Sequence, residues 1–215
     1  MRNRSIFLLT VVALVAVTVT SCGDRYPVIR GNGIEGRDVR SVAKFKSISI
    51  EGKANVYYAQ ADTSLVIVKS DKNIIPFVYT TVENGCLNIY MKDHINLHPS
   101  KKLSILVYSP SVACINSEGI GNLYIPGKLH VDSLSVHIEG IGSIRFTDSL
   151  FFHSLYLHVE GIGGVKATKL KGDNVVTHIE GIGKIKLGGV INSLDKGSDG
   201  ISKINTDHLT VLNRK

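Results

Sequence analysis

The chain has 215 residues and a formal net charge of +7, a length that suits one domain or one array of stacked repeats. The basic residues are spread along the chain without a run of like charges, which argues against nucleic-acid binding and leaves weak attraction to anionic polysaccharide or lipid open. Three cysteines are too few for a disulfide scaffold.

The N-terminus has the pattern of a bacterial lipoprotein signal peptide. Two arginines precede an apolar run over residues 6–19, which is shorter than the about 20 residues of a membrane-spanning helix. The run ends in Val19-Thr20-Ser21-Cys22-Gly23, where small residues precede a cysteine that would take the lipid. We expect residues 1–21 to be removed and Cys22 to anchor the protein in the cell envelope, at the outer membrane, facing the periplasm or the exterior. A plain signal peptide or an uncleaved anchor helix is the alternative.

Residues 22–30 are interpreted as a tether, and residues 31–215 as a single all-β domain. Helical periodicity is absent, and residues 45–50 and 87–91 alternate apolar and polar side chains as strands do. Asn84-Gly85 is a tight-turn signal that suits a hairpin. Ile50-Glu51-Gly52 and Gly31-Asn32-Gly33 resemble diverged copies of the corners described next; a separate β-sandwich is the alternative for this half.

An internal repeat dominates residues 111–205. The tetrapeptide Glu-Gly-Ile-Gly begins at Glu118, Glu139, Glu160 and Glu180, and a degenerate copy begins at Asp199, so the copies recur every 19–21 residues. Apolar residues alternate before and after each copy, which gives every repeat short strands with one apolar face. Such strands are stable only when repeats stack about 4.8 Å apart and bury these faces together.

This spacing predicts a right-handed parallel β-helix, a solenoid with rungs of about 20 residues. Glycine would supply the sharp corners, and the isoleucine of each copy would point into the core. The tail after Ile201 is expected to form the last strand or a cap. The glycines expected at the corners are Gly119, Gly121, Gly140, Gly142, Gly161, Gly163, Gly181 and Gly183.

Two cysteines remain once Cys22 is set aside. An envelope location permits a disulfide between Cys86 and Cys114. We favour two free, partly buried thiols.

Three features in order resemble the head GIN domain family of auto-transporter adhesins from Bacteroidetes lipoproteins. A Gly-x-Gly segment at 31–33 precedes a stretch with Phe45, Ile48, Ile50, Gly52 and Val56; Asn84-Gly85 with Leu87 and Ile89 follows; serial glycine corners come last. The corners here read Gly-Ile-Gly, where the family more often has Gly-Ser-Gly. The resemblance spans about residues 31–205 and implies a pectin-lyase-like β-helix without catalytic residues and a role in cell adhesion.

A histidine stands two residues before the glutamate in three repeats. In stacked rungs these side chains would form a histidine column beside a glutamate column, with carboxylates about 5 Å apart that repel by roughly 1 kcal/mol in water. We favour glutamates that accept N–H bonds from their own corners beside neutral histidines; a grid that binds a cation or ligand, or a pH-responsive face, is the alternative. The residues of this candidate binding ladder are His137, Glu139, His158, Glu160, His178 and Glu180.

No catalytic motif is present, and we expect no catalytic residues, no metal and no cofactor, because a flat ladder of ligands converges poorly. Five tyrosines of the N-terminal half are expected mostly in the core, and any that face outward would suit stacking on sugar rings. They are Tyr57, Tyr58, Tyr79, Tyr90 and Tyr108.

We therefore predict a non-catalytic, lipid-anchored envelope protein that acts in adhesion or ligand binding through the surface of its repeats. A glycan or an extracellular protein is the expected partner beside the membrane, and a homo-oligomer is left open. The alternatives are a polysaccharide-processing enzyme, which would need a groove with converging Asp and Lys or Arg, and a structural or assembly protein of the envelope.

Overall fold

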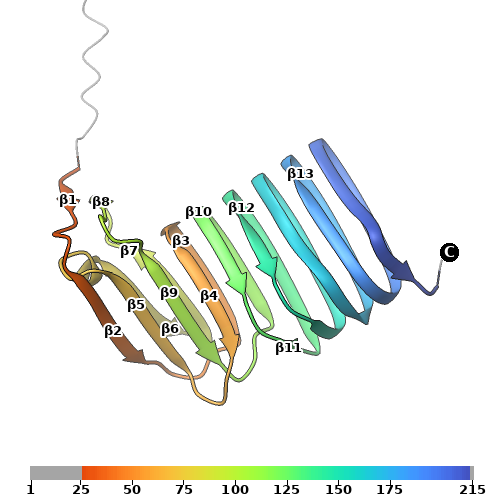
Figure 1. Ribbon diagram of the computed structural model, residues 1–215, viewed down its shortest axis with the longest axis horizontal. Helices are drawn as coiled ribbons and strands as arrows, with labels where there is room; N and C mark the ends of the chain where they lie inside the picture. The colour runs from red at the N-terminus through yellow and green to blue at the C-terminus, as the bar shows by residue number, and fades with distance from the viewer. Residues whose placement is uncertain (1–25, 214–215) are drawn as a thin grey trace, which may run out of the picture.

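The computed structural model describes residues 26–213, which are strands almost throughout (Figure 1). The predicted signal peptide and Cys22 lie outside the described residues. No helix in the described part is long and apolar enough to cross a membrane. The strands before the repeats are β1 (Val28–Arg30), β2 (Glu35–Ser41), β3 (Ser47–Lys53), β4 (Asn55–Gln60), β5 (Leu65–Asp71), β6 (Val78–Glu83), β7 (Cys86–Met91), β8 (Asn96–His98) and β9 (Ser104–Ser109), with a 3₁₀ turn η1 (Ile75–Phe77).

The repeats form the longer elements β10 (Cys114–Ile125), β11 (Leu129–His130), β12 (Ser133–Phe146) and β13 (Leu150–Val211). β10 pairs parallel with β12, and β12 with β13, so that Glu118, Glu139 and Glu160 lie side by side in register. Each of these ribbons bends at its glycines into two arms, and the bent ribbons follow one another along the long axis of the molecule (Figure 1).

The expected right-handed parallel β-helix is wrong. β2 pairs antiparallel with β5, β5 with β9, and β6 with β7, so the strands form a mixed sheet that curls into a half-barrel (Figure 1). The reason lies in the connections of the N-terminal half. A tight turn such as Asn84-Gly85 reverses the chain at once and joins antiparallel neighbours, whereas a parallel coil needs a connection that returns to the starting end.

The N-terminal strands belong to the same sheet as the repeats, through β3 and β4 on the free side of β10. Glu51 pairs with Glu118 and Gly52 with Gly119, so Ile50-Glu51-Gly52 is a diverged corner, as the sequence indicated. Gly31-Asn32-Gly33 instead lies in a loop beside Asp71. β1, which lies wholly inside the predicted tether, pairs with β8 in a small sheet of its own.

The core fills the inside of the curl. The alternating residues of the repeats are buried there as predicted, because every second side chain of a strand faces the same side. After the last repeat, Leu209 is buried, and the Leu212 amide donates to the Ile191 carbonyl at 3.0 Å, so the tail continues the sheet as its last strand. The buried residues before the corners are Leu134, Val136, Ile138, Leu155, Leu157, Val159, Val175, Thr177 and Ile179.

Candidate functional site

The corners of the repeats are built from glycine because two backbones meet there without room for a side chain. Gly119, Gly140, Gly161 and Gly181 have φ between 112° and 122°, in the left-handed region that favours glycine. The second glycine of each corner lies flat against the preceding rung: a Cβ on Gly142 would come within 1.9 Å of the Gly121 carbonyl oxygen. The predicted corner glycines are thus all where a turn or a close approach requires them.

The isoleucines between these glycines point outward, which corrects the expectation that they fill the core. Ile120, Ile141 and Ile162 are each 49% exposed, Ile182 is 51% exposed and Ile201 is 78% exposed. The inside of the corner is closed by glycine backbones in contact, so the one side chain of the turn must lie outside. We call this row of five isoleucines the isoleucine ridge.

The histidine and glutamate columns exist beside the ridge. The His137 and His158 rings stack with centroids 4.9 Å apart, and the His158 and His178 rings with centroids 5.6 Å apart. Asn116 occupies the preceding position, paired with His137.

Glu160 and Glu180 bond to histidines rather than to corner amides. His158 Nε2 lies 2.8 Å from Glu160 Oε1, and His178 Nε2 lies 3.0 Å from Glu180 Oε1. The hydrogen bond from His158 lowers the pKa of Glu160 below its ordinary value; partial burial opposes the shift, and the charges of His158 and His137 add to it. Two of the three His–Glu rungs of the ladder therefore hold imidazole–carboxylate pairs.

A carboxylate that the sequence prediction left out joins the ladder. Asp199 Oδ2 lies 3.5 Å from His178 Nε2, because the degenerate copy at 199–202 stacks on the preceding repeat. The ligand atoms of His178, Glu180 and Asp199 all lie within 4.8 Å of one another, as do those of His137, Glu139 and Glu160. Asp199 could have been predicted from the sequence, because it stands at the glutamate position of the degenerate copy.

A shallow cleft lined by tyrosines lies on the outer face of the N-terminal half. It has a volume of about 330 Å³ and is bordered by Tyr57, Tyr108, Leu106, Lys69 and Pro126. Tyr58, by contrast, is fully buried, and burial raises its pKa while the hydrogen bond with Ser109 opposes the shift.

Basic side chains gather at this cleft, which we call the tyrosine cleft. The Tyr57 ring stacks on Tyr124 with centroids 5.0 Å apart, and Lys102 Nζ lies 3.2 Å from the Tyr57 hydroxyl oxygen. Arg145 lies over the Tyr124 ring at 6.0 Å from its centroid. The sequence prediction missed Tyr124, Lys102 and Arg145, since only the register of β9, β4, β10 and β12 brings them together.

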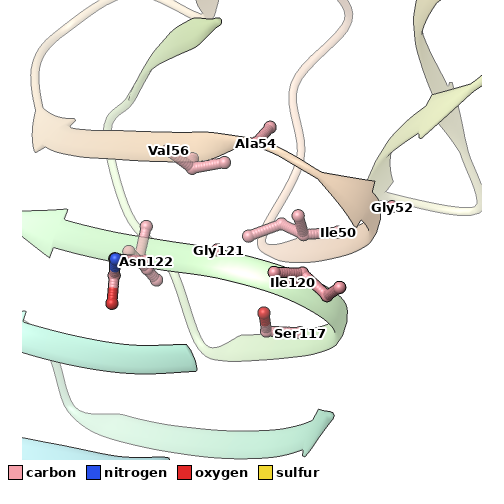
Figure 2. A pocket seen from close by; sticks show the side chains of 9 residues that line it. Ile50, Gly52, Ala54, Val56, Ser117, Ile120, Gly121 and Asn122 are labelled. Carbon is pink, nitrogen blue, oxygen red and sulfur yellow. The ribbon is translucent and has the colours of Figure 1, made fainter. Parts of the chain in front are cut away.

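A second hollow, at the first corner, is too small for a ligand. Figure 2 shows Ile50 and Gly52 of β3, Val56 of β4 and Ala54 between the two strands facing the corner of β10. The cavity between them holds about 10 Å³, close to the least space that one water molecule needs. It reflects imperfect packing between a diverged corner and a regular one.

The two cysteines are free thiols, as favoured from the sequence. Cys86 and Cys114 both pair with Ser47, from opposite sides, so one strand separates them. Burial raises the pKa of both thiols, and the nearby Cys114 raises that of Cys86 further.

The comparisons with known proteins agree with the features above. The family model described as "Putative auto-transporter adhesin, head GIN domain" matches residues 44–215, which confirms the resemblance seen in the sequence. None of the curated proteins matches the chain.

Solved structures share the fold. A "putative adhesin" of Parabacteroides distasonis has a TM-score of 0.82 at 23% identity, over 86% of this chain and 79% of that one. A "Putative lipid binding protein" of the same species has 0.78 at 22%, over 85% and 77%. A "putative adhesin" of Bacteroides fragilis has 0.64 at 18%, over 83% and 99%.

Proposed function

Because this chain belongs to the "Putative auto-transporter adhesin, head GIN domain" family, we propose that it is a non-catalytic, lipid-anchored adhesion protein of the cell envelope that contacts protein partners through the isoleucine ridge. The observation that carries this proposal is the exposure of the same large apolar side chain at all five corners from Gly119 to Gly200. Its expected anchor is Cys22.

The ridge supports a binding role because nothing in the fold requires isoleucine there. The side chains lie outside the core. Polar residues at the same positions would not expose a row of aliphatic side chains to water. A contiguous row of exposed apolar side chains is typical of a protein–protein contact. Isoleucine offers aliphatic area without an aromatic face, which suits a protein surface better than a sugar.

The regularity of the ridge suggests how affinity would arise. Neighbouring strands are about 4.8 Å apart, so the isoleucines present equal contacts at equal intervals. Each contact is weak, and several made together on one rigid body add up without a deep pocket. An extended partner, such as a strand or a fibrous protein, matches this arrangement.

The tyrosine cleft supports a second candidate, recognition of an acidic glycan. Stacked Tyr57 and Tyr124 offer apolar ring faces, and Lys69, Lys102 and Arg145 offer positive charge beside them. Aromatic faces with neighbouring cations fit a sugar ring that carries a carboxylate or a sulfate.

One binding experiment separates these candidates. The full chain is tested on an array of matrix proteins and glycans beside a ridge variant, in which Ile120, Ile141, Ile162 and Ile182 are replaced by threonine. Threonine keeps the β-branch that suits a strand and removes apolar area. We expect protein binding to weaken at least about tenfold, or ~1.4 kcal/mol, with an unchanged circular dichroism spectrum.

Two controls make the result specific. Val176→Thr with Val190→Thr removes exposed aliphatic area away from the ridge and should leave binding unchanged. Tyr57→Ala with Tyr124→Ala should affect glycan binding alone. Protein binding that survives in the ridge variant contradicts the proposal, and loss of self-association without any ligand would indicate an assembly protein instead.

A further inference from the structure

The carboxylates of the repeats form a column that lacks ordinary counterions. Register places Glu51, Glu118, Glu139 and Glu160 in adjacent strands, and the stacking of Gly181 on Gly161 and of Gly200 on Gly181 extends the column to Glu180 and Asp199. Adjacent strands are about 4.8 Å apart, so each carboxylate between the two ends of the column has like charges on both sides. The column is therefore repulsive unless cations neutralise it.

Lysine and arginine do not supply these cations. Within residues 26–213, no Lys or Arg side chain forms an ion pair with the column; the ion pairs of Lys and Arg there join Arg40 to Asp38 and Lys169 to Asp148. The groups that reach the column are the imidazoles of His158 and His178. A neutral imidazole donates one hydrogen bond and leaves the negative charge in place.

Two groups in the column have the ligand set of a divalent transition metal. One is His137, Glu139 and Glu160, and the other is His178, Glu180 and Asp199. Each takes a histidine and a glutamate from one rung and a carboxylate from the next. The two negative charges of each group match the two positive charges of such an ion.

The distances in the second group fit zinc. Tetrahedral Zn²⁺ with ligands at about 2.0–2.1 Å separates neighbouring ligand atoms by about 3.4 Å. His178 Nε2 lies 3.0 Å from Glu180 Oε1 and 3.5 Å from Asp199 Oδ2, on either side of that value. An ion can therefore enter with small rotations of exposed side chains.

The spacing of the two groups also suits two ions. Ions on adjacent rungs would lie about 4.8 Å apart and repel strongly. The groups begin at His137 and at His178, two rungs apart, so their ions would lie about 10 Å apart. The rung between the two groups holds His158 and Glu160. Glu160 belongs to the first group and also keeps its hydrogen bond with His158.

We propose that the histidine–carboxylate ladder binds two Zn²⁺ ions, one at His137, Glu139 and Glu160 and one at His178, Glu180 and Asp199. Imidazole with carboxylate favours Zn²⁺ over Ca²⁺ and Mg²⁺, which prefer oxygen ligands throughout. Each ion has three protein ligands and a fourth position open to water. The ions neutralise four of the six carboxylates of the column and fix the His137 and His178 rings, and this role is independent of contact through the ridge.

Titration of the full chain with Zn²⁺ near neutral pH, with binding measured by calorimetry, tests the proposal. The reference is the double variant E160Q/D199N, which loses one carboxylate from each group and keeps any zinc held by thiols. We expect the wild type to bind two more ions than this double variant. Each single variant, E160Q or D199N, should bind one more ion than the double variant. Each substitution should weaken its own site at least about tenfold.

Matched variants show whether the histidines are ligands. H137N/H178N should lose both ions, whereas H153N and D173N alter a similar His–Asp pair outside the column and should keep both. Circular dichroism in EDTA establishes that all variants fold. Equal zinc binding by wild type and E160Q/D199N, or zinc binding that survives in H137N/H178N, overturns the proposal, as does Ca²⁺ binding that matches Zn²⁺.

Discussion

Asp71 is a buried carboxylate that ties together the loops at the N-terminal end of the sheet. It accepts hydrogen bonds from the amides of Gly33, Ser100 and Lys101 at 2.7–2.9 Å and from the Ser100 hydroxyl at 2.5 Å. Burial alone would raise its pKa, but these hydrogen bonds outweigh burial and hold the pKa at about 2. Its partners are 29–38 residues away in the sequence and mostly backbone amides, which no motif reveals.

We predict that Asp71 stabilises the fold above about pH 4 and that this stabilisation is lost as pH falls toward 2. The folded-state pKa lies below the unfolded value of about 3.9, so protonation favours unfolding in that window. Asp71→Asn should lower Tm by about 5 °C at neutral pH and flatten the acid side of the stability curve. Thermal melts from pH 7 to 2 test this; parallel curves for both proteins would contradict it.

The corner glycines tolerate no side chain, and this too can be measured. Gly142→Ala places a Cβ against the Gly121 carbonyl oxygen and should cost about 3 kcal/mol in urea unfolding. Gly127→Ala is the control, because a Cβ there meets nothing within 4 Å; it should change stability by less than about 0.5 kcal/mol. Equal effects of the two substitutions would show that the close approach of backbones does not limit the corner.

At the scale of elements, the sequence predicted the strands of the repeats and their faces well. Alternation assigned Leu134, Val136 and Ile138 to the inside, and the spacing of the tetrapeptides set the register of β10, β12 and β13. Whether the N-terminal strands β2, β5 and β9 pair in parallel or antiparallel could not be predicted in the same way. Alternation is identical for parallel and antiparallel strands, so the pairs of β5 with β2 and β9 depend on long-range contacts.

The isoleucines show a second limit of pattern reading. An apolar residue between two glycines was assigned to the core by composition alone. Which side of a corner it occupies depends on how closely the backbones pack, and Gly119 and Gly121 both contact the preceding rung. The positions of the candidate ladder were predictable because they lie on regular strand, whereas the pairing of each histidine with its glutamate required side-chain geometry.

At the scale of the whole molecule, one sheet has two kinds of strand pairing along its length. The N-terminal half has hairpins and local antiparallel pairs, and the C-terminal half has parallel rungs that contact only their neighbours. The ridge and the ladder run the length of the parallel half, while the tyrosine cleft lies mainly on the other half. Both proposed contacts can therefore be removed separately.

The parallel half can also change its length by whole units. A duplicated repeat would find the same neighbours that every existing repeat finds, so a tandem copy of residues 143–163 should insert without strain. We predict that such a protein unfolds at or above the wild-type Tm and is longer by about 4.8 Å in small-angle scattering. A collapse in Tm would contradict this. Duplication of a repeat in the gene would thus be a simple means of changing the length of this protein, one isoleucine at a time.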